Sequence, residues 1–306
     1  TDKNPVVDIA MPDPTVIKAA DGYFYVYATE STRNVPIMKS KDLVEWTYCN
    51  TAFTNKTRPR FEPKAGIWAP DINYINGKYV LYYAMSVWGG EQTCGIGVAT
   101  ANSPQGPFTD HGKMFRSNEI GVQNSIDPSL LQYEGRNYLV WGSFRGIYVI
   151  ELTADGLSIM PGAKKKRIAG TAFEAVYIHK HGDYYYMFAS IGSCCQGVKS
   201  TYKVVVGRSK KVWGPYKDKT GKPMLKNGYS LVIGANDHFV GNGHGSQIIQ
   251  DDAGQDWLLY HGFSRSTPEN GRILLLDQIK WDQEGWPYVE GGSPSYETQK
   301  APVFNN

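Results

Sequence analysis

Hydrophobic and polar positions alternate in short runs that are separated by glycine-containing turns, and helical periodicity is almost absent. One representative unit reads Asp71-Ile-Asn-Tyr-Ile, then the turn Asn76-Gly77, then Lys78-Tyr-Val-Leu-Tyr-Tyr-Ala. Asn-Gly between two such runs is the strongest two-residue indication of a β-hairpin. The pattern therefore predicts short antiparallel strands over most of the chain.

This unit occurs five times along the chain. In each copy a polar residue opens a short strand, a glycine turn follows and an aromatic strand returns; the opening residues are Asp13, Asp71, Asp127, Glu174 and His244. Their mean spacing is roughly 58 residues, a period typical of repeat architectures. β-Propellers repeat four-stranded blades around a central channel. We expect one all-β, five-bladed β-propeller over residues 1–306, because no Pro/Ser-rich linker divides the chain.

The innermost strands of a propeller line its axis, so the five opening side chains are expected to meet at one end of the channel. Clustered acids lose hydration and repel each other, which indicates a function or a bound cation. Asp13 and Asp127 precede prolines, which favour extended backbone and would hold each carboxylate in a defined direction. Asp71 is equally consistent with a structural turn residue.

Glu174 lies in the apolar stretch Phe173-Glu174-Ala175-Val176. Desolvation there would raise its pKa, as a general acid requires. One carboxyl group kept acidic by burial and a second one ionised form the pair that hydrolyses glycosides. The sequence thus indicates a glycosidase with paired carboxyl groups.

At these same residues the chain resembles glycoside hydrolase family 43, particularly its endo-α-1,5-L-arabinanases. The resemblance extends from about residue 8 to about residue 280. The resemblance is carried by several short stretches, among them Asp13-Pro-Thr-Val-Ile17, Trp68-Ala-Pro-Asp-Ile72, Ile126-Asp-Pro-Ser-Leu130, Gly142-Ser-Phe144, Glu174-Ala-Val-Tyr-Ile178 and Cys194 to Ser209.

The resemblance implies a propeller that inverts the anomeric carbon, with Asp13 as general base, Glu174 as general acid and Asp127 as the group that tunes the pKa of the acid. It also implies a water-coordinated calcium ion beside His244, although calcium prefers about six to eight oxygen ligands and a histidine alone holds it poorly. The residues expected to contact substrate are Trp68, Asp71, Ser143, Phe144 and Arg272.

The sequence leaves several alternatives for the identity of the substrate. Cleavage of α-L-arabinofuranosidic bonds in arabinan or arabino-oligosaccharides is the first hypothesis. A β-xylosidase, xylanase or α-L-arabinofuranosidase acting on xylan would use the same carboxyl groups, and a non-catalytic sugar-binding propeller is a third reading. Pro12, Val176 and Gly245 depart from the arabinanase pattern near the sugar subsites, which leaves substrate and endo or exo action undecided.

The amino-acid composition restricts the classes of molecule that the protein is expected to bind. Aromatic residues make up 13% of the chain, which suits both sugar stacking and aromatic sheet cores. The net charge is +3 with scattered basic residues, so no nucleic-acid footprint is visible, and the longest apolar runs are too short to span a bilayer. We expect a monomer that acts on plant cell-wall polysaccharide and is secreted or periplasmic, because polysaccharides are met outside the cytoplasm.

The four cysteines, Cys49, Cys94, Cys194 and Cys195, lack the spacing of a zinc site. We expect mostly buried thiols, and we expect the adjacent pair not to form an ordinary unstrained disulfide with itself.

Overall fold

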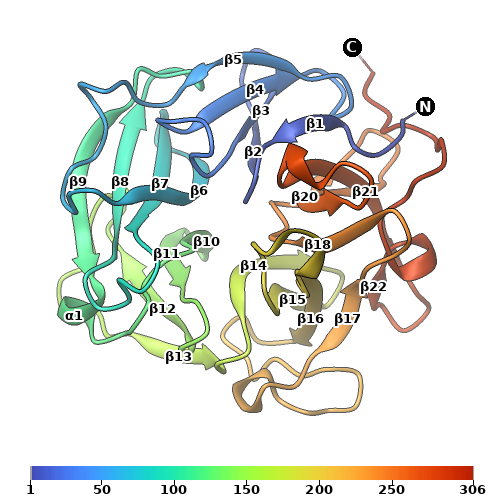
Figure 1. Cartoon of the computed structure of the whole chain (residues 1–306). Coiled ribbons are helices and arrows are strands. Elements are labelled where there is room, and N and C mark those ends of the chain that lie inside the picture. Colours follow the sequence, from blue (N-terminus) through green and yellow to red (C-terminus); the bar gives the residue numbers. More distant parts are fainter. Residues whose placement is uncertain (1, 306) are drawn as a thin grey trace.

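The computed structural model describes residues 2–305 and consists of five antiparallel sheets arranged in a ring (Figure 1). This arrangement confirms the predicted five-bladed β-propeller. Four of the sheets contain four strands each, joined in chain order. Among residues 2–305 no helix is long and apolar enough to cross a membrane.

The first four blades run consecutively along the chain. The first contains β2 (Thr15–Lys18), β3 (Phe24–Tyr27), β4 (Pro36–Ser40) and β5 (Thr47–Thr51). The second contains β6 (Gly66–Ile75), β7 (Lys78–Ser86), β8 (Gly95–Ala101) and β9 (Thr109–Arg116). The third contains β10 (Ser129–Tyr133), β11 (Arg136–Trp141), β12 (Ile147–Leu152) and β13 (Lys166–Ala169). The fourth contains β14 (Glu174–His181), β15 (Tyr184–Ile191), β16 (Lys203–Ser209) and β17 (Ser230–Ile233).

The fifth blade joins the two ends of the chain. Its strands follow the order β1-β21-β20-β18, with β19 also paired to β20 and β22 to β21. Val7 of β1 lies opposite Leu274 of β21, so the first strand closes the ring (Figure 1). The bounds are β1 (Val7–Ala10), β18 (Phe239–Gly243), β19 (Ile249–Gln250), β20 (Asp256–Ser264), β21 (Ile273–Trp281) and β22 (Pro287–Tyr288).

Within residues 2–305, helical structure is confined to single turns in the connections. These are α1 (Ser117–Ile120), η1 (Gly197–Lys199), η2 (Met224–Lys226), η3 (Pro268–Asn270) and η4 (Glu290–Gly292).

The hydrophobic core lies in the seams between neighbouring blades. Each of five buried clusters combines residues from two adjacent sheets. Fully buried aromatic side chains are prominent in them, among them Tyr27, Tyr83, Trp141 and Trp257. Such rings bury large apolar areas, so much of the aromatic composition serves core packing.

The entry to each inner strand shows a common backbone feature that corrects the predicted repeat register. At each of these five entries one residue has a positive φ between 38° and 57°, and these residues are Asp13, Ala69, Asp127, Ala175 and His244. Asp71 therefore lies two residues after the repeat position, and Glu174 lies one residue before it. The positive φ also shows that the expected extended backbone at Asp13 and Asp127 was wrong: a sharp turn, not an extended segment, aims each carboxylate.

Candidate active site

A cleft of about 680 Å³ opens where the inner strands begin, a size typical of small-molecule sites. Most of the predicted site residues line it, namely Asp13, Trp68, Asp127, Ser143, Phe144, Glu174, His244 and Arg272. The exception is Asp71, which lines a separate cavity of about 20 Å³. The fold thus gathers carboxyl groups from three blades that are far apart in sequence.

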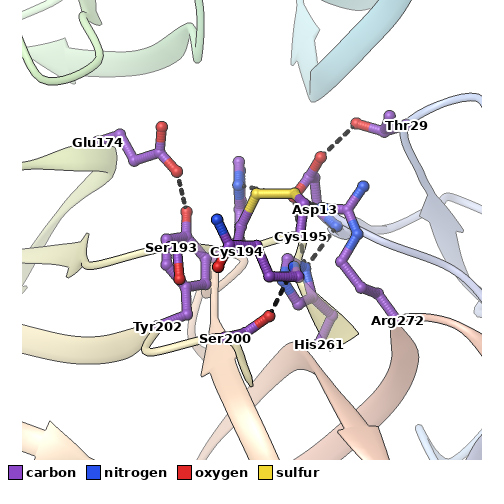
Figure 2. The surroundings of a disulfide bond; sticks show 12 residues. Asp13, Thr29, Glu174, Ser193, Cys194, Cys195, Ser200, Tyr202, His261 and Arg272 are labelled. Atoms are coloured by element: carbon purple, nitrogen blue, oxygen red, sulfur yellow. Dashed lines mark hydrogen bonds and ion pairs between the residues drawn. A yellow bond between two sulfur atoms is a disulfide. The ribbon is translucent and has the colours of Figure 1, made fainter. Parts of the chain in front are cut away.

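Asp13 is surrounded by positive charge. Its Oδ1 lies 3.0 Å from Nδ1 of His244 and 3.1 Å from Nη1 of Arg272, and its Oδ2 accepts a hydrogen bond of 2.6 Å from Thr29 (Figure 2). Burial alone would raise the pKa of Asp13, but the charges of Arg272 and His244 outweigh it and hold the pKa well below its usual range. Asp13 is therefore a buried, ionised carboxylate.

The two histidines beside Asp13 differ in charge: His244 is cationic and His261 is neutral. Burial would lower the pKa of His244, but the adjacent Asp13 carboxylate raises it to about 9. The backbone N–H of Asp13 donates to Nδ1 of His261 at 3.0 Å, so that nitrogen carries no proton. Burial also holds the pKa of His261 well below its usual range. His261 is thus neutral, and its 3.4 Å approach to Asp13 Oδ1 is not an ion pair.

Glu174 lies in a different environment. Its Oε1 accepts a 2.6 Å hydrogen bond from Ser143, and its Oε2 accepts one from the Tyr202 hydroxyl. Burial raises the pKa of Glu174, and these two hydrogen bonds only partly oppose the rise. In the view of Figure 2, Glu174 and Asp13 lie on opposite sides of the disulfide between Cys194 and Cys195.

Asp127 lines the same cleft. Its Oδ2 accepts a 3.0 Å hydrogen bond from the backbone N–H of Ala175, the residue after Glu174. Burial, followed by the charge of Glu174, raises the pKa of Asp127. Because each carboxylate disfavours ionisation of the other, Asp127 and Glu174 titrate as a pair that retains a proton more readily than isolated carboxyl groups.

Asp71 binds the inner strands to one another instead of facing the cleft. Its Oδ1 accepts from Gln247 at 3.0 Å, and its Oδ2 accepts from the backbone N–H of Leu130 at 2.9 Å. Burial raises its pKa to about 7. These contacts join the second, third and fifth blades, so the geometry supports the structural reading of Asp71 and separates it from the substrate contacts that we expected.

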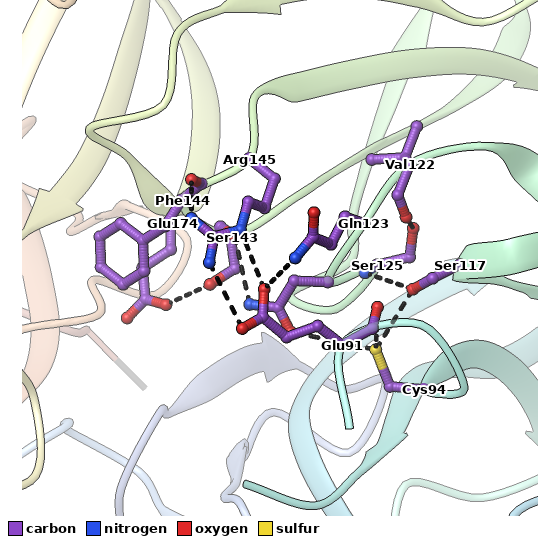
Figure 3. A network of polar contacts seen from close by, with 11 residues as sticks. Glu91, Cys94, Ser117, Val122, Gln123, Ser125, Ser143, Phe144, Arg145 and Glu174 are labelled. Atoms are coloured by element: carbon purple, nitrogen blue, oxygen red, sulfur yellow. Dashed lines mark hydrogen bonds and ion pairs between the residues drawn. The ribbon is translucent and has the colours of Figure 1, made fainter. Parts of the chain in front are cut away.

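Aromatic rings and an ion pair form the cleft wall. Trp68 lies beside Trp88, whose side chain is 77% exposed, with 5.3 Å between ring centroids. Glu91 pairs with Arg145 at 2.9 Å and accepts a hydrogen bond from Gln123 at 3.0 Å (Figure 3). This network connects the loop after β7 with the loop after β11, and so holds two walls of the cleft together.

The prediction of mostly buried thiols was wrong. Cys194 and Cys195 form a disulfide with each other, line the cleft and are not buried; Cys94 alone of the four is buried. They occupy the loop between β15 and β16, which turns back so that the backbone N–H of Tyr202 donates to the carbonyl of Ser193 at 3.0 Å. The same loop therefore carries both the disulfide and the hydroxyl group that holds Glu174.

Three residues of the site, Thr29, His261 and Tyr202, were not predicted from the sequence. Thr29 and His261 share a recognisable position, the polar residue that ends the returning aromatic strand of a repeat unit. Ser143 and Ser190 occupy similar places, and Ser190 accepts a 2.9 Å hydrogen bond from the backbone N–H of His244. The polar residue at the end of the returning strand could therefore have been predicted to form a hydrogen bond with the segment that opens a repeat unit.

The residues around His244 do not form a built calcium site. Its Nδ1 faces Asp13 at 3.0 Å, and with its pKa raised to about 9 the ring is an imidazolium without a free lone pair. Besides the large cleft, His244 lines a cavity of about 20 Å³ that has room for about one water molecule, whereas calcium takes about six to eight oxygen ligands. Calcium at His244 therefore stays a prediction, which calorimetric titration with calcium would test.

Known proteins resemble this chain over nearly its whole length. The model of Glycosyl hydrolases family 43 matches residues 2–287. The chain is 37% identical to the extracellular endo-α-(1→5)-L-arabinanase 1 of Bacillus subtilis (strain 168), over 90% of this chain and 86% of that protein. It is 36% identical to an extracellular exo-α-(1→5)-L-arabinofuranosidase of Cellvibrio japonicus, over 91% of this chain and 86% of that protein.

A solved structure of a Cellvibrio cellulosa α-L-arabinanase complexed with arabinohexaose has the same fold. Its TM-score is 0.83 at 34% sequence identity, and the match covers 92% of this chain and 95% of that chain. Together with the family match over residues 2–287 and the paired carboxyl groups in the cleft, this likeness settles the family. The chain belongs to glycosyl hydrolase family 43.

Proposed function

We propose that the protein is an inverting glycoside hydrolase that cleaves α-L-arabinofuranosidic bonds in arabinan or arabino-oligosaccharides. One observation carries this proposal: a single cleft holds Asp13 ionised and keeps a proton on the pair formed by Glu174 and Asp127. Carboxyl groups whose pKa values are pushed apart are what acid–base hydrolysis of a glycoside needs.

In the proposed mechanism Asp13 is the general base. It removes a proton from a water molecule as the water oxygen attacks the anomeric carbon. Glu174 is the general acid and protonates the leaving glycosidic oxygen as its bond to that carbon breaks. Water enters opposite to the leaving group, so the anomeric configuration inverts. Asp127 is coupled to Glu174, so that the pair retains a proton, and it accepts a hydrogen bond from the backbone N–H of Ala175.

The substrate class rests on the relatives and on the cleft wall. The similar proteins are named arabinanases and an arabinofuranosidase. Trp68, Trp88 and Phe144 offer aromatic faces on which the apolar sides of furanose rings can pack. Because both endo- and exo-acting relatives are similar to this chain, the product pattern has to decide between the two modes.

Two further parts of the proposal concern the protein in its environment. The two relatives are named extracellular, which supports secretion of this protein as well. We also expect it to act as a monomer. Sedimentation of the purified protein tests the second point.

A product profile tests the function. The purified protein is incubated with debranched arabinan and, in parallel, with linear xylan, and the released sugars are separated by chain length. We expect arabinose or arabino-oligosaccharides from arabinan and at most traces from xylan. Asp13→Asn and Glu174→Gln should each lower the rate by ~10²–10⁴-fold, whereas exposed Asp237→Asn should not change it. Binding of oligosaccharide without turnover, or faster release from xylan, would contradict the proposal.

A further inference from the structure

A second cluster of polar side chains lies far from the cleft, at the seam between the fourth and fifth blades. His179 and His181 are alternate residues of β14, so their side chains leave the same face of the strand. Asp256 begins β20 in the neighbouring blade. His181 lies seven residues along β14 from Glu174, which is about 20 Å at the rise of a β-strand, and none of the three residues lines the cleft.

The three side chains converge on one point. One candidate ligand atom from each lies within 4.8 Å of the other two. Nδ1 of His181 is 4.0 Å from Oδ2 of Asp256. Among residues 2–305 neither imidazole has a hydrogen bond to a protein group, so their ring nitrogens are not committed to other partners in the described structure.

The surroundings hold two of these groups in place. Trp281 donates from Nε1 to Oδ2 of Asp256 at 2.8 Å, and Gln250 donates to Oδ1 at 3.5 Å. The ring of His181 stacks on Trp281 with 3.7 Å between centroids and 5° between planes. Hydrogen bonds and packing of this kind orient metal ligands in proteins. Asp256 is 5% exposed and His181 is 37% exposed, so an ion has a path from solvent.

We propose that His179, His181 and Asp256 bind a divalent transition-metal ion, with zinc the best match, and that the ion joins the fourth blade to the fifth. Two imidazole nitrogens and one carboxylate oxygen suit zinc, cobalt and nickel, and suit calcium and magnesium poorly. Tetrahedral zinc with bonds of about 2.0–2.1 Å places its ligand atoms roughly 3.3 Å apart. Small side-chain rotations bring the three groups from their present spacing to that distance, and water completes the coordination.

The ion links strands of different sheets. Binding to the folded state alone would therefore stabilise the seam, and the midpoint of thermal unfolding would rise with zinc concentration. This role is separate from glycoside hydrolysis, so the expected readouts are metal binding and unfolding temperature, with hydrolysis unaffected by loss of the site.

Cobalt titration tests the proposal. Full-length protein without a histidine tag is freed of metal with a chelator and titrated with Co²⁺, whose visible absorption reports ligation, and with Zn²⁺ in a calorimeter. We expect one equivalent to bind. His179→Gln and Asp256→Asn should weaken binding by at least ~10-fold and remove the zinc-dependent rise in the unfolding midpoint.

His238→Gln is the matched control, because His238 is exposed and stacks on Tyr296, with 3.5 Å between centroids, in the way that His181 stacks on Trp281. It should bind metal as the unmodified protein does. Circular dichroism checks that each variant folds, and Asp256→Asn keeps the shape of the site should His179→Gln fail to fold. Absence of binding, or equal affinity in the unmodified protein and Asp256→Asn, would overturn the proposal and leave the cluster as inter-blade packing.

Discussion

Asp13 and Glu174 are both buried carboxyl groups, yet the pKa of Asp13 is lowered and the pKa of Glu174 is raised. Asp13 faces Arg272 and His244, which keep its pKa low despite burial. Burial raises the pKa of Glu174, and the hydrogen bonds from the Ser143 and Tyr202 hydroxyl groups and the charge of His244 oppose this rise only in part. The division between base and acid therefore follows from the cations in direct contact with Asp13.

The assignment of Glu174 as general acid predicts a dependence on the leaving group. Glu174→Gln should lose ~10²–10⁴-fold in kcat/KM on arabino-oligosaccharides, whose leaving oxygen needs a proton. The loss should be far smaller on a nitrophenyl arabinofuranoside, because nitrophenolate leaves without protonation. Asp13→Asn should lose activity on both substrates. Equal losses on the two substrates in Glu174→Gln would remove the acid role from Glu174.

The hydroxyl of Tyr202 predicts a shift of the pH profile. Its hydrogen bond favours the ionised form of Glu174 and so lowers the pKa of that carboxyl group. Tyr202→Phe removes this effect, so the pKa rises and the alkaline limb of kcat/KM against pH should move to higher pH. Tyr82→Phe removes a buried hydroxyl outside the cleft and should leave the profile in place. A shift to lower pH in Tyr202→Phe would contradict the account.

Arg272 should determine the acidic limb of the plot of kcat/KM against pH. Its charge lowers the pKa of Asp13, which must be ionised to accept a proton. In Arg272→Gln the pKa of Asp13 rises, and the acidic limb of kcat/KM should move to higher pH, while the exposed control Arg265→Gln should not move it. An unchanged acidic limb would mean that the base is another group.

At the scale of elements, closure of the ring determines the geometry around the base. β1 pairs with β21, and the backbone N–H of Met11 donates to the carbonyl of Arg272 at 2.9 Å. This pairing brings the segment that carries Asp13 beside Arg272, although 259 positions separate them in the chain. The N-terminal strand is thus part of both the fold and the site.

Side chains that pack at the pairing of β1 with β21 should contribute more to the free energy of unfolding than exposed side chains at the edge of a blade. Leu274 lies opposite Val7, with 0% exposure, whereas Leu231 of β17 is 52% exposed. Leu274→Ala should lower the free energy of unfolding by about 2–5 kcal/mol. Leu231→Ala should change it by no more than about 0.5 kcal/mol. Urea unfolding measures both, and similar effects of the two substitutions would contradict the importance of the closing strand.

The sequence predicted the inner hairpin of each blade but not the whole blade. The alternation and glycine turns identify pairs such as β6 and β7, because those signals are local. The partner of β1 lies at the other end of the chain, and no local pattern indicates such a pairing. The register of Asp71 and Glu174 was misjudged for a related reason: the turn that defines the repeat position is a backbone conformation, which polar residue types alone do not reveal.

At the scale of the whole molecule, five-fold repetition explains why distant residues share one cleft. Asp13, Asp127 and Glu174 meet there as expected, since each stands at or beside the entry to an inner strand. The groups that hold them escaped prediction because Thr29 and His261 resemble ordinary strand ends. Tyr202 reaches Glu174 from a loop, and its direction depends on the fold of the segment after Cys195.

The central claim is that the Asp13 carboxylate activates water and does not itself attack the sugar. Proton NMR of the first product released from an α-linked arabino-oligosaccharide tests this directly, before mutarotation mixes the anomers. If Asp13 activates water, the new reducing end appears first as the β anomer. First appearance of the α anomer would show retention through a covalent intermediate and would contradict the assigned role of Asp13.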